Sequence, residues 1–227
     1  MKDVSVIIPV LNEERVIARR LAELRALGLE EVIVADGGST DGTEALVARF
    51  PEVRWLEAPR GRARQMNAGA ALARGRVLLF LHADVELPRD ALEVVARTLE
   101  DPQVVAGAFR TWTVADRPTR LGPLLHLADL RSRCSRLPYG DQALFVRAEV
   151  FQRLGGFPAQ PLMEDLELSR RLWTQGRVEV ARARVQVSGR RFIEHPLRYT
   201  FLINVFPALY RLGVPPERLA RLYEHVR

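Results

Sequence analysis

Short apolar runs alternate with helical patterns through the first hundred residues. Residues 4–10 are apolar and β-branched, which predicts a strand buried on both faces. Residues 13–27 carry apolar side chains at helical spacing, and Gly28 stops the pattern. The same alternation predicts strands over 31–35, 53–57 and 76–81, and helices over 42–50, 62–73 and 88–100. This order predicts crossover connections and a largely parallel sheet.

The remaining residues are less regular. They predict strands over 104–113 and 142–147, a helix near 118–134, a helix over 163–175, a hairpin-like pair over 177–182 and 184–189, and final helices over 197–211 and 216–225. We therefore expect an α/β protein with a Rossmann-like mixed, mainly parallel sheet flanked by helices. One domain would span 1–195, with halves 1–100 and 101–195, and a C-terminal helical tail, 196–227, would pack on it.

Composition narrows the class without naming a function. The chain has 227 residues, 48% of them hydrophobic and 27% charged, as ordinary globular domains do. Cys134 is the only cysteine, so no intrachain disulfide forms and a cytoplasmic location fits. The formal net charge is +6, but the arginines are spread along the chain, which does not favour nucleic acid as a partner. A solvated arginine-rich surface is the simplest interpretation of this charge, and attraction to a diphosphate ligand or an anionic membrane surface is the alternative.

Polar residues follow the predicted strands where the strands end. In open α/β sheets, ligands bind beyond these carboxyl ends. Residues 9–13, 36–39 and 82–84 lie there, and 60–67 begin an arginine-rich helix. The first two segments offer acceptors for a base and a ribose, and the helix start offers donors for phosphates. Asp84 offers a hard oxygen ligand for a divalent cation. These segments predict a nucleotide-diphosphate pocket.

Several of these residues also have structural interpretations. Asp41 with Glu44 fits a helix-capping pair, and Gly37 with Gly38 fits a tight turn. His82 suits either a packed histidine or a contact with ribose or metal. The arginines of the helix start also suit a solvated surface: Arg60, Arg62 and Arg64.

Five motifs together resemble the family 2 glycosyltransferases, which have the GT-A fold. They are residues 5–14, 35–43, 60–69, 82–84 and 163–165, in the family's order, and the resemblance covers about 3–190. Residues 138–142, 154–158 and 161–171 are similar to the bacterial branch known as radical-SAM/selenodomain-associated transferase 2, or arsenosugar-biosynthesis glycosyltransferase. By this resemblance, 1–100 binds the nucleotide and 101–195 binds the acceptor.

The resemblance also implies roles for single residues. A nucleotide-sugar, favoured to be a UDP-sugar, would contact Pro9, Leu11, Glu13, Asp36, Arg64, His82 and Ala83. Asp84 would bind Mg²⁺ or Mn²⁺ as the last Asp of a DxD-type motif, whose first Asp is His82 here. Asp165 would be the base of an inverting transfer to an acceptor hydroxyl, although Glu164, Asp165 and Glu167 also suit a structural role, in which they complement the dipole of the helix that they begin. The acceptor side would include Asp141, Gln142 and Glu164, of which Asp141 and Glu164 are alternative bases.

The acceptor and the tail are less defined. Five aromatic residues suit either stacking on a sugar ring or core packing: Trp112, Tyr139, Trp173, Tyr199 and Tyr210. Apolar residues and arginines in the tail permit peripheral membrane contact. The sequence leaves the acceptor and the oligomeric state undefined.

Three rival functions make different demands on the sequence. A sugar-phosphate nucleotidyltransferase needs a glycine- and arginine-rich loop after the first strand, where 11–14 read Leu-Asn-Glu-Glu. A nucleotide-sugar-binding protein without transferase activity would explain His82. A dinucleotide-dependent oxidoreductase needs G-x-G-x-x-G after the first strand, and this motif is missing there.

Overall fold

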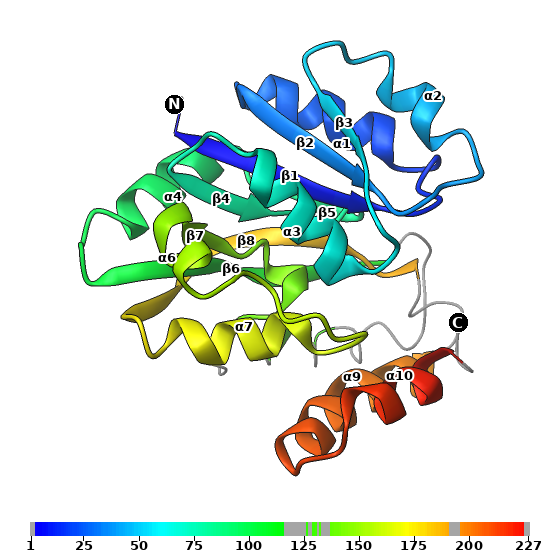
Figure 1. The fold of residues 1–227 in the computed structure, drawn as a ribbon, viewed down its shortest axis with the longest axis vertical. Coiled ribbons are helices and arrows are strands. Elements are labelled where there is room, and N and C mark those ends of the chain that lie inside the picture. The colour runs from blue at the N-terminus through cyan, green and yellow to red at the C-terminus, as the bar shows by residue number, and fades with distance from the viewer. Residues whose placement is uncertain are drawn as a thin grey trace.

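The computed structural model describes residues 3–115, 126, 129, 130, 132, 137–190 and 196–224. An eight-stranded mixed sheet runs through the molecule in the order β3-β2-β1-β4-β7-β6-β8-β5, with helices on both sides (Figure 1). This confirms the predicted α/β class. None of the helices within the described ranges is long and apolar enough to cross a membrane.

The first half of the sheet is parallel. Its strands are β1 (Val4–Val10), β2 (Glu31–Asp36), β3 (Arg54–Glu57) and β4 (Val77–Phe80). β1 pairs in parallel with β2 on one side and with β4 on the other, and β2 pairs with β3. The carboxyl ends of β1, β2 and β4 therefore meet at one edge, as the sequence predicts.

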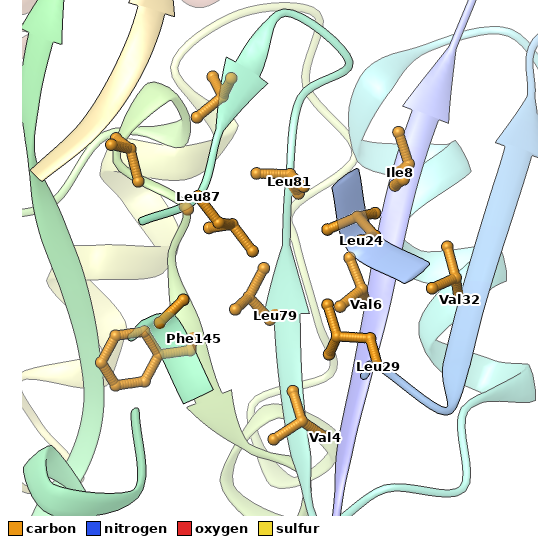
Figure 2. Packing of buried hydrophobic residues seen from close by; sticks show 14 of the residues in the cluster. Val4, Val6, Ile8, Leu24, Leu29, Val32, Leu79, Leu81, Leu87 and Phe145 are labelled. Carbon is orange, nitrogen blue, oxygen red and sulfur yellow. The ribbon is translucent and has the colours of Figure 1, made fainter. Parts of the chain in front are cut away.

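Alternate residues of β1 enter two different cores. Val4, Val6 and Ile8 join one cluster with Leu24 of α1 (Ile17–Ala26), as Figure 2 shows. Ile7 faces the opposite cluster, which contains Met66 of α3 (Arg62–Leu72). A strand has a side-chain period of two, so a continuous apolar run is what a strand buried on both faces requires. The helices α2 (Thr43–Val47) and α4 (Ala91–Thr98) complete this half.

The second half mixes strand directions. β7 (Phe145–Arg147) is antiparallel to both β4 and β6 (Val104–Val114), and β8 (Arg177–Ser188) runs parallel to β6. The short strand β5 (Val85–Glu86) is the edge strand on this side and pairs antiparallel with β8. The predicted hairpin over 177–189 is therefore wrong. Between Ala108 and Arg110 of β6, the partner on β8 changes from Val180 to Arg184, and this bulge interrupts the alternation within one strand.

Short elements also depart from prediction. The single turn η1 (Gly140–Gln142) precedes β7, and the helix α6 (Ala148–Arg153), like β5, is not predicted. The predicted helix near 118–134 lies almost wholly outside the described residues; positions 126, 129, 130 and 132 are helical.

Three of the described helices come after residue 160. These are α7 (Glu164–Leu172), α9 (Pro196–Arg211) and α10 (Pro216–Glu224), with α9 and α10 beside each other (Figure 1). A small apolar cluster joins Leu202 and Phe206 of α9, Leu219 of α10 and Leu162 from the segment before α7. The division at residue 195 stays a prediction.

Candidate functional site

Gln65 holds the ends of β1 and β2 together. Its side-chain amide donates to the carbonyl oxygens of Val10, at 2.7 Å, and Ala35, at 2.8 Å. The residue is only 4% exposed. A Cβ on Gly37 would lie 3.0 Å from the Gln65 side chain, so a glycine leaves room for it. The first turn of α3 is thereby fixed over the edge where the sequence places the nucleotide pocket.

Asp36 shapes the turn that follows β2. Its carboxylate accepts hydrogen bonds from the backbone N–H groups of Gly38 and Ser39, both at 2.9 Å, and from the Ser39 hydroxyl at 2.5 Å. Gly38 has a φ of +90°, which glycine adopts without strain. The carboxylate that the sequence assigns to the base is thus preorganised by its own loop and is 4% exposed.

The loops after β1 and β2 are joined by further polar contacts. Asn12 accepts from the Thr40 N–H at 2.8 Å, and its own N–H donates to Ser39 Oγ at 2.9 Å. Asp41 accepts from the N–H groups of Thr43, at 3.0 Å, and Glu14, at 3.2 Å. The predicted capping pair of Asp41 with Glu44 is therefore wrong: Asp41 links the two loops instead.

The other residues expected at the base and ribose lie on the same edge. Pro9 is the β1 residue opposite Ala35, and Leu11 is half-buried in the loop that follows. Glu13 is also half-buried, and its Oε2 lies 3.8 Å from Arg190 Nη2. The segment that follows β8 therefore lies beside the end of β1.

His82 and Asp165 meet at Gly140. A Cβ on Gly140 would lie 3.0 Å from the His82 ring and 3.2 Å from Asp165 Oδ2. Asp165 Oδ2 accepts from the Gly140 N–H at 2.6 Å, and Oδ1 accepts from the Leu166 N–H at 2.7 Å. Two backbone donors therefore orient a half-buried carboxylate beside the motif that follows β4.

The first turn of α7 directs three carboxylates to three neighbours. Successive helical residues are rotated by roughly 100°, so these side chains diverge. Glu164, 1% exposed, forms an ion pair of 2.6 Å between its Oε1 and Arg62 Nε of α3. Burial raises the pKa of Glu164 above its ordinary range, with Arg62 opposing the shift and Asp165 adding to it. Asp165 turns to Gly140 instead.

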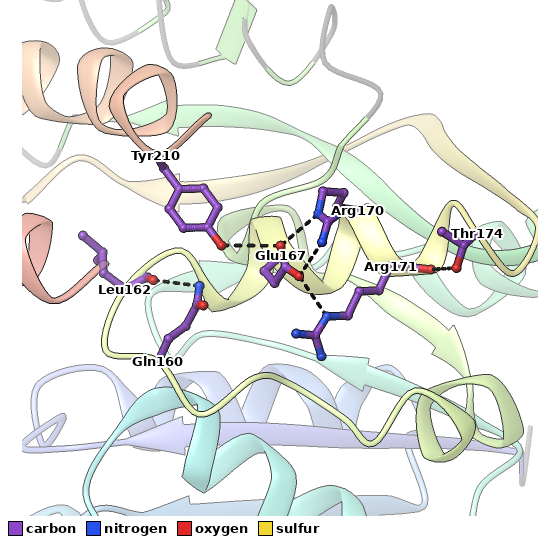
Figure 3. A network of polar contacts seen from close by, with 7 residues as sticks. All are labelled: Gln160, Leu162, Glu167, Arg170, Arg171, Thr174 and Tyr210. Atoms are coloured by element: carbon purple, nitrogen blue, oxygen red, sulfur yellow. Dashed lines mark hydrogen bonds and ion pairs between the residues drawn. The ribbon is translucent and has the colours of Figure 1, made fainter. Parts of the chain in front are cut away.

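Glu167, the third carboxylate, turns to the tail. Its Oε1 lies 2.9 Å from both Arg170 Nη2 and Arg171 Nε, and the Tyr210 hydroxyl donates to Oε2 at 3.4 Å (Figure 3). These arginines lower the pKa of Glu167 to about 2, with Arg170 contributing most. Glu167 therefore remains ionised under ordinary conditions.

The turn before α7 is held in an unusual conformation. Met163 has a φ of 63°, a left-handed value that is strained for a side chain of this kind. Farther back, the Asn67 amide of α3 forms two hydrogen bonds with the Phe157 backbone, at 2.8 and 2.9 Å. Contacts from α3 thus position both the segment leading to α7 and its first residue.

Asp84 faces a pocket of about 390 Å³. Arginines line this pocket from two elements: Arg15, Arg19 and Arg20 near the start of α1, and Arg190 after β8. Buried Arg20 also donates from Nε to the Ala83 carbonyl at 3.2 Å, which fixes the backbone of the motif. Ala83 is itself buried.

The chemistry at Asp84 is compatible with a divalent cation shared with a ligand. Within the described ranges, its half-buried carboxylate makes no hydrogen bond or ion pair with another residue. No group of three or more His, Cys, Asp or Glu side chains forms a metal cage in the same ranges. A cation here would therefore take its remaining oxygens from phosphates and water.

The other predicted site residues divide between open and committed side chains. Arg60 and Arg64 are exposed at the start of α3, whereas Arg62 is paired with Glu164. Asp141 is half-buried. Gln142 is 1% exposed, and its amide bonds to the backbone of Tyr139, at 3.0 Å, and Phe109, at 2.9 Å. Both the oxygen and the nitrogen of the Gln142 amide are therefore already used to hold the backbone.

The aromatic residues are equally mixed. Trp112 stacks on His126 with ring centroids 4.3 Å apart, and the Arg184 guanidinium lies 5.0 Å from the Trp112 ring centroid. Tyr139 is buried, while Trp173 is 37% exposed. The Tyr199 side chain lies outside the described part of the chain.

Comparisons with known proteins point to one family. The model of Glycosyl transferase family 2 matches residues 5–155. The chain is 36% identical over 115 residues to the uncharacterized glycosyltransferase YfnE of Bacillus subtilis, which covers 46% of this chain and 29% of that protein. The chain spans between 29% and 56% of the length of the curated relatives that it matches.

Solved structures share the fold. The mannosyltransferase PcManGT from Pyrobaculum calidifontis, in complex with GDP-Man and Mn²⁺, superposes with a TM-score of 0.71 at 23% identity, covering 98% of this chain and 69% of that one. Staphylococcus aureus TarS 1–349, in complex with UDP-GlcNAc, gives 0.65 at 20% identity, covering 82% and 58%. With a family match over more than half of its length and the same fold in these structures, the chain belongs to glycosyl transferase family 2.

Proposed function

We propose that this chain is a metal-dependent, inverting glycosyltransferase that moves a sugar from a nucleoside-diphosphate sugar to an acceptor hydroxyl. The observation that carries the proposal is the meeting of His82 and Asp165 at Gly140, beside the edge where Asp36 and Asp84 lie. A candidate base thus stands next to a candidate donor pocket.

The donor would lie across the carboxyl edge of the parallel strands. The base and ribose would contact Pro9, Leu11, Glu13, Asp36 and Arg64, and the sugar phosphate would reach His82 and Ala83. A UDP-sugar is the favoured donor. UDP-GlcNAc is bound in the TarS structure and GDP-Man in the mannosyltransferase structure. These two ligands support a nucleotide sugar as the donor, but they differ in the nucleobase and so do not select uracil or guanine.

The charge of the leaving diphosphate must be balanced. Asp84 would hold Mg²⁺ or Mn²⁺, and that cation would neutralise part of the phosphate charge. Arg190 lines the same pocket, so its guanidinium can face the diphosphate together with the exposed Arg64. Arg62 is a weaker candidate because Glu164 already engages it.

Asp165 would take the proton of the acceptor hydroxyl. The N–H groups of Gly140 and Leu166 fix its orientation. The acceptor oxygen would attack the anomeric carbon from the face opposite the diphosphate, which would invert the configuration at that carbon. The alternatives are weaker: Glu164 is 1% exposed and ion-paired. Asp141, the other alternative, is half-buried on η1.

A thermal-shift panel tests the donor assignment. Nucleotide sugars are added with and without Mn²⁺, and we expect a UDP-sugar to raise the melting temperature only when the cation is present. Asp84→Asn should abolish the Mn²⁺ dependence. Exposed Asp90→Asn, several residues farther along the chain, is the matched control and should behave as wild type.

The same samples separate the rival functions. Slow, Mn²⁺-dependent donor hydrolysis supports a transferase. Metal-independent binding without hydrolysis would identify a nucleotide-sugar-binding protein. Pyrophosphate release from a nucleoside triphosphate and a sugar phosphate would identify a nucleotidyltransferase.

The finer assignment rests on sequence alone. We place the chain in the radical-SAM/selenodomain-associated branch because of residues 138–142, 154–158 and 161–171. A cytoplasmic enzyme with peripheral membrane contact through the tail is the arrangement we propose for it.

A further inference from the structure

A second pocket lies between α7 and the tail. Its volume is about 430 Å³, within the range of small-molecule sites. Apolar residues of three segments line it: Leu137, Leu166 and Val214, with Pro215 and Pro216. Charged groups stand among them, namely Glu167, Arg170 and Arg211. The pocket therefore combines an apolar wall with ionised side chains.

The balance of charge in this pocket favours an anion. The charge of Glu167 is balanced by Arg170 and Arg171, and the Tyr210 hydroxyl donates a hydrogen bond to the same carboxylate (Figure 3). Arg211 is exposed and forms no ion pair with any residue in the described ranges. A guanidinium of this kind beside an apolar wall suits a ligand with a carboxylate or phosphate on an apolar body.

The pocket adjoins the candidate base. Leu166, one wall of the pocket, follows Asp165, and its N–H bonds to that carboxylate. Leu137, on another wall, precedes Gly140 in the chain, and the Gly140 N–H bonds to the same carboxylate. One of the two backbone groups that orient Asp165, the Leu166 N–H, thus belongs to a residue that lines the pocket, and the other lies three residues after Leu137.

We propose that this pocket is the acceptor subsite and that it takes an anionic acceptor with an apolar body. The inference rests on the proposed function, because it needs Asp165 as the base. A ligand seated against Leu166, with its anion at Arg211, would lie beside the first turn of α7, which carries Asp165.

A membrane surface is the competing occupant. Phe201, Leu212 and Leu222 of the tail are 62%, 81% and 53% exposed. These residues are not among those lining the pocket, so an adsorbed bilayer would not fill it. The lining and its unpaired guanidinium favour a single ligand molecule, and vesicles serve as the alternative arm of the test.

Binding of octyl phosphate, below its micelle concentration and at fixed ionic strength, tests the pocket by calorimetry. Neutral octyl glucoside and inorganic phosphate are the comparison probes. We expect octyl phosphate to bind most tightly and Arg211→Glu to weaken it by about tenfold or more. Arg218→Glu is the matched control, since Arg218 is exposed on α10 outside the pocket, and its effect should stay within about twofold.

Three results would overturn the subsite: equal binding of octyl glucoside, equal losses in the Arg211 and Arg218 variants, or binding only to phosphatidylglycerol vesicles. Bound octyl phosphate should also slow donor hydrolysis, because it excludes water from Asp165. Unchanged hydrolysis at saturation would remove the acceptor role. Failure of hydrolysis without any octyl phosphate counts against the proposed function alone, and the calorimetry still decides the pocket.

Discussion

Arg62 Nε lies 2.6 Å from Glu164 Oε1, and this ion pair joins the helix at the candidate donor pocket to the helix that carries the candidate base. The Glu164 side chain is 2% exposed and that of Arg62 is 36% exposed. Glu164 is thus the buried partner of the pair, and Arg62 is the partner that also contacts solvent.

Breaking the pair from the arginine side should destabilise the protein. Arg62→Met leaves Glu164 buried without its cation, and we expect a loss of about 1–3 kcal/mol in the free energy of unfolding, below the full value for a buried pair because Arg62 is partly exposed. Adding Glu164→Gln should recover part of that loss, which urea denaturation of the four proteins of the cycle measures. Exposed Arg60→Met is the control. Strictly additive losses would show that the pair is not coupled.

Glu164 should also make stability depend on pH in a distinct window. Its pKa is raised in the folded state, so the folded protein binds a proton more readily than the unfolded chain. The free energy of unfolding should therefore fall as pH rises above the ordinary value of 4.5. Glu164→Gln should flatten this slope between neutral and mildly acidic pH. An unchanged slope in the variant would assign the effect to another group.

Glu167 should act with the opposite sign. Its pKa is lowered to about 2, so its contribution is present above the unfolded value of 4.5 and is lost as pH falls toward 2. Because Arg170 is 68% exposed and screened by solvent, we expect about 1 kcal/mol. Glu167→Gln should remove this acid-induced loss in denaturation curves taken from pH 6 to 2.5. The exposed Glu149→Gln on α6 is the control and should retain it.

Asp165→Asn should separate donor binding from transfer. The amide keeps the size of the carboxylate but cannot accept a proton, so the donor-induced shift in melting temperature should persist while transfer falls by about 100-fold or more. Gly140→Ala should give a milder loss of turnover, because its methyl group would press on His82 and Asp165. Unchanged turnover in Asp165→Asn would return the role of base to Glu164 or Asp141.

The sequence predicts the parallel half of the sheet well because β1, β2 and β4 are short, largely apolar runs that alternate with helical patterns. It also places residues 9–13, 36–39 and 82–84 correctly at one edge, since parallel strands end together. The bulge of β8 explains why the sequence predicts a hairpin instead of one strand. The additional residues interrupt the two-residue alternation on which strand assignment depends.

Long-range polar contacts are equally hidden from the sequence. The pairing of Arg62 with Glu164, and the contact of Glu13 with Arg190, depend on how separate elements pack. The arginines of the α3 start look alike in sequence, yet burial divides them into one structural and two open side chains. The pocket beside the tail has no sequence signal at all, because its walls come from three distant segments.

The clamp formed by Gln65 has a consequence for how this region can evolve. Two carbonyl oxygens on adjacent strands need a neutral group with two N–H bonds on one nitrogen, at the reach of a four-atom side chain. Glutamate would set oxygen against oxygen, lysine would bring an unbalanced charge into the interior, and asparagine is too short. We therefore expect few substitutions at position 65 to be tolerated. Chains that share this loop arrangement should keep the amide even where they use different sugar donors and sugar acceptors.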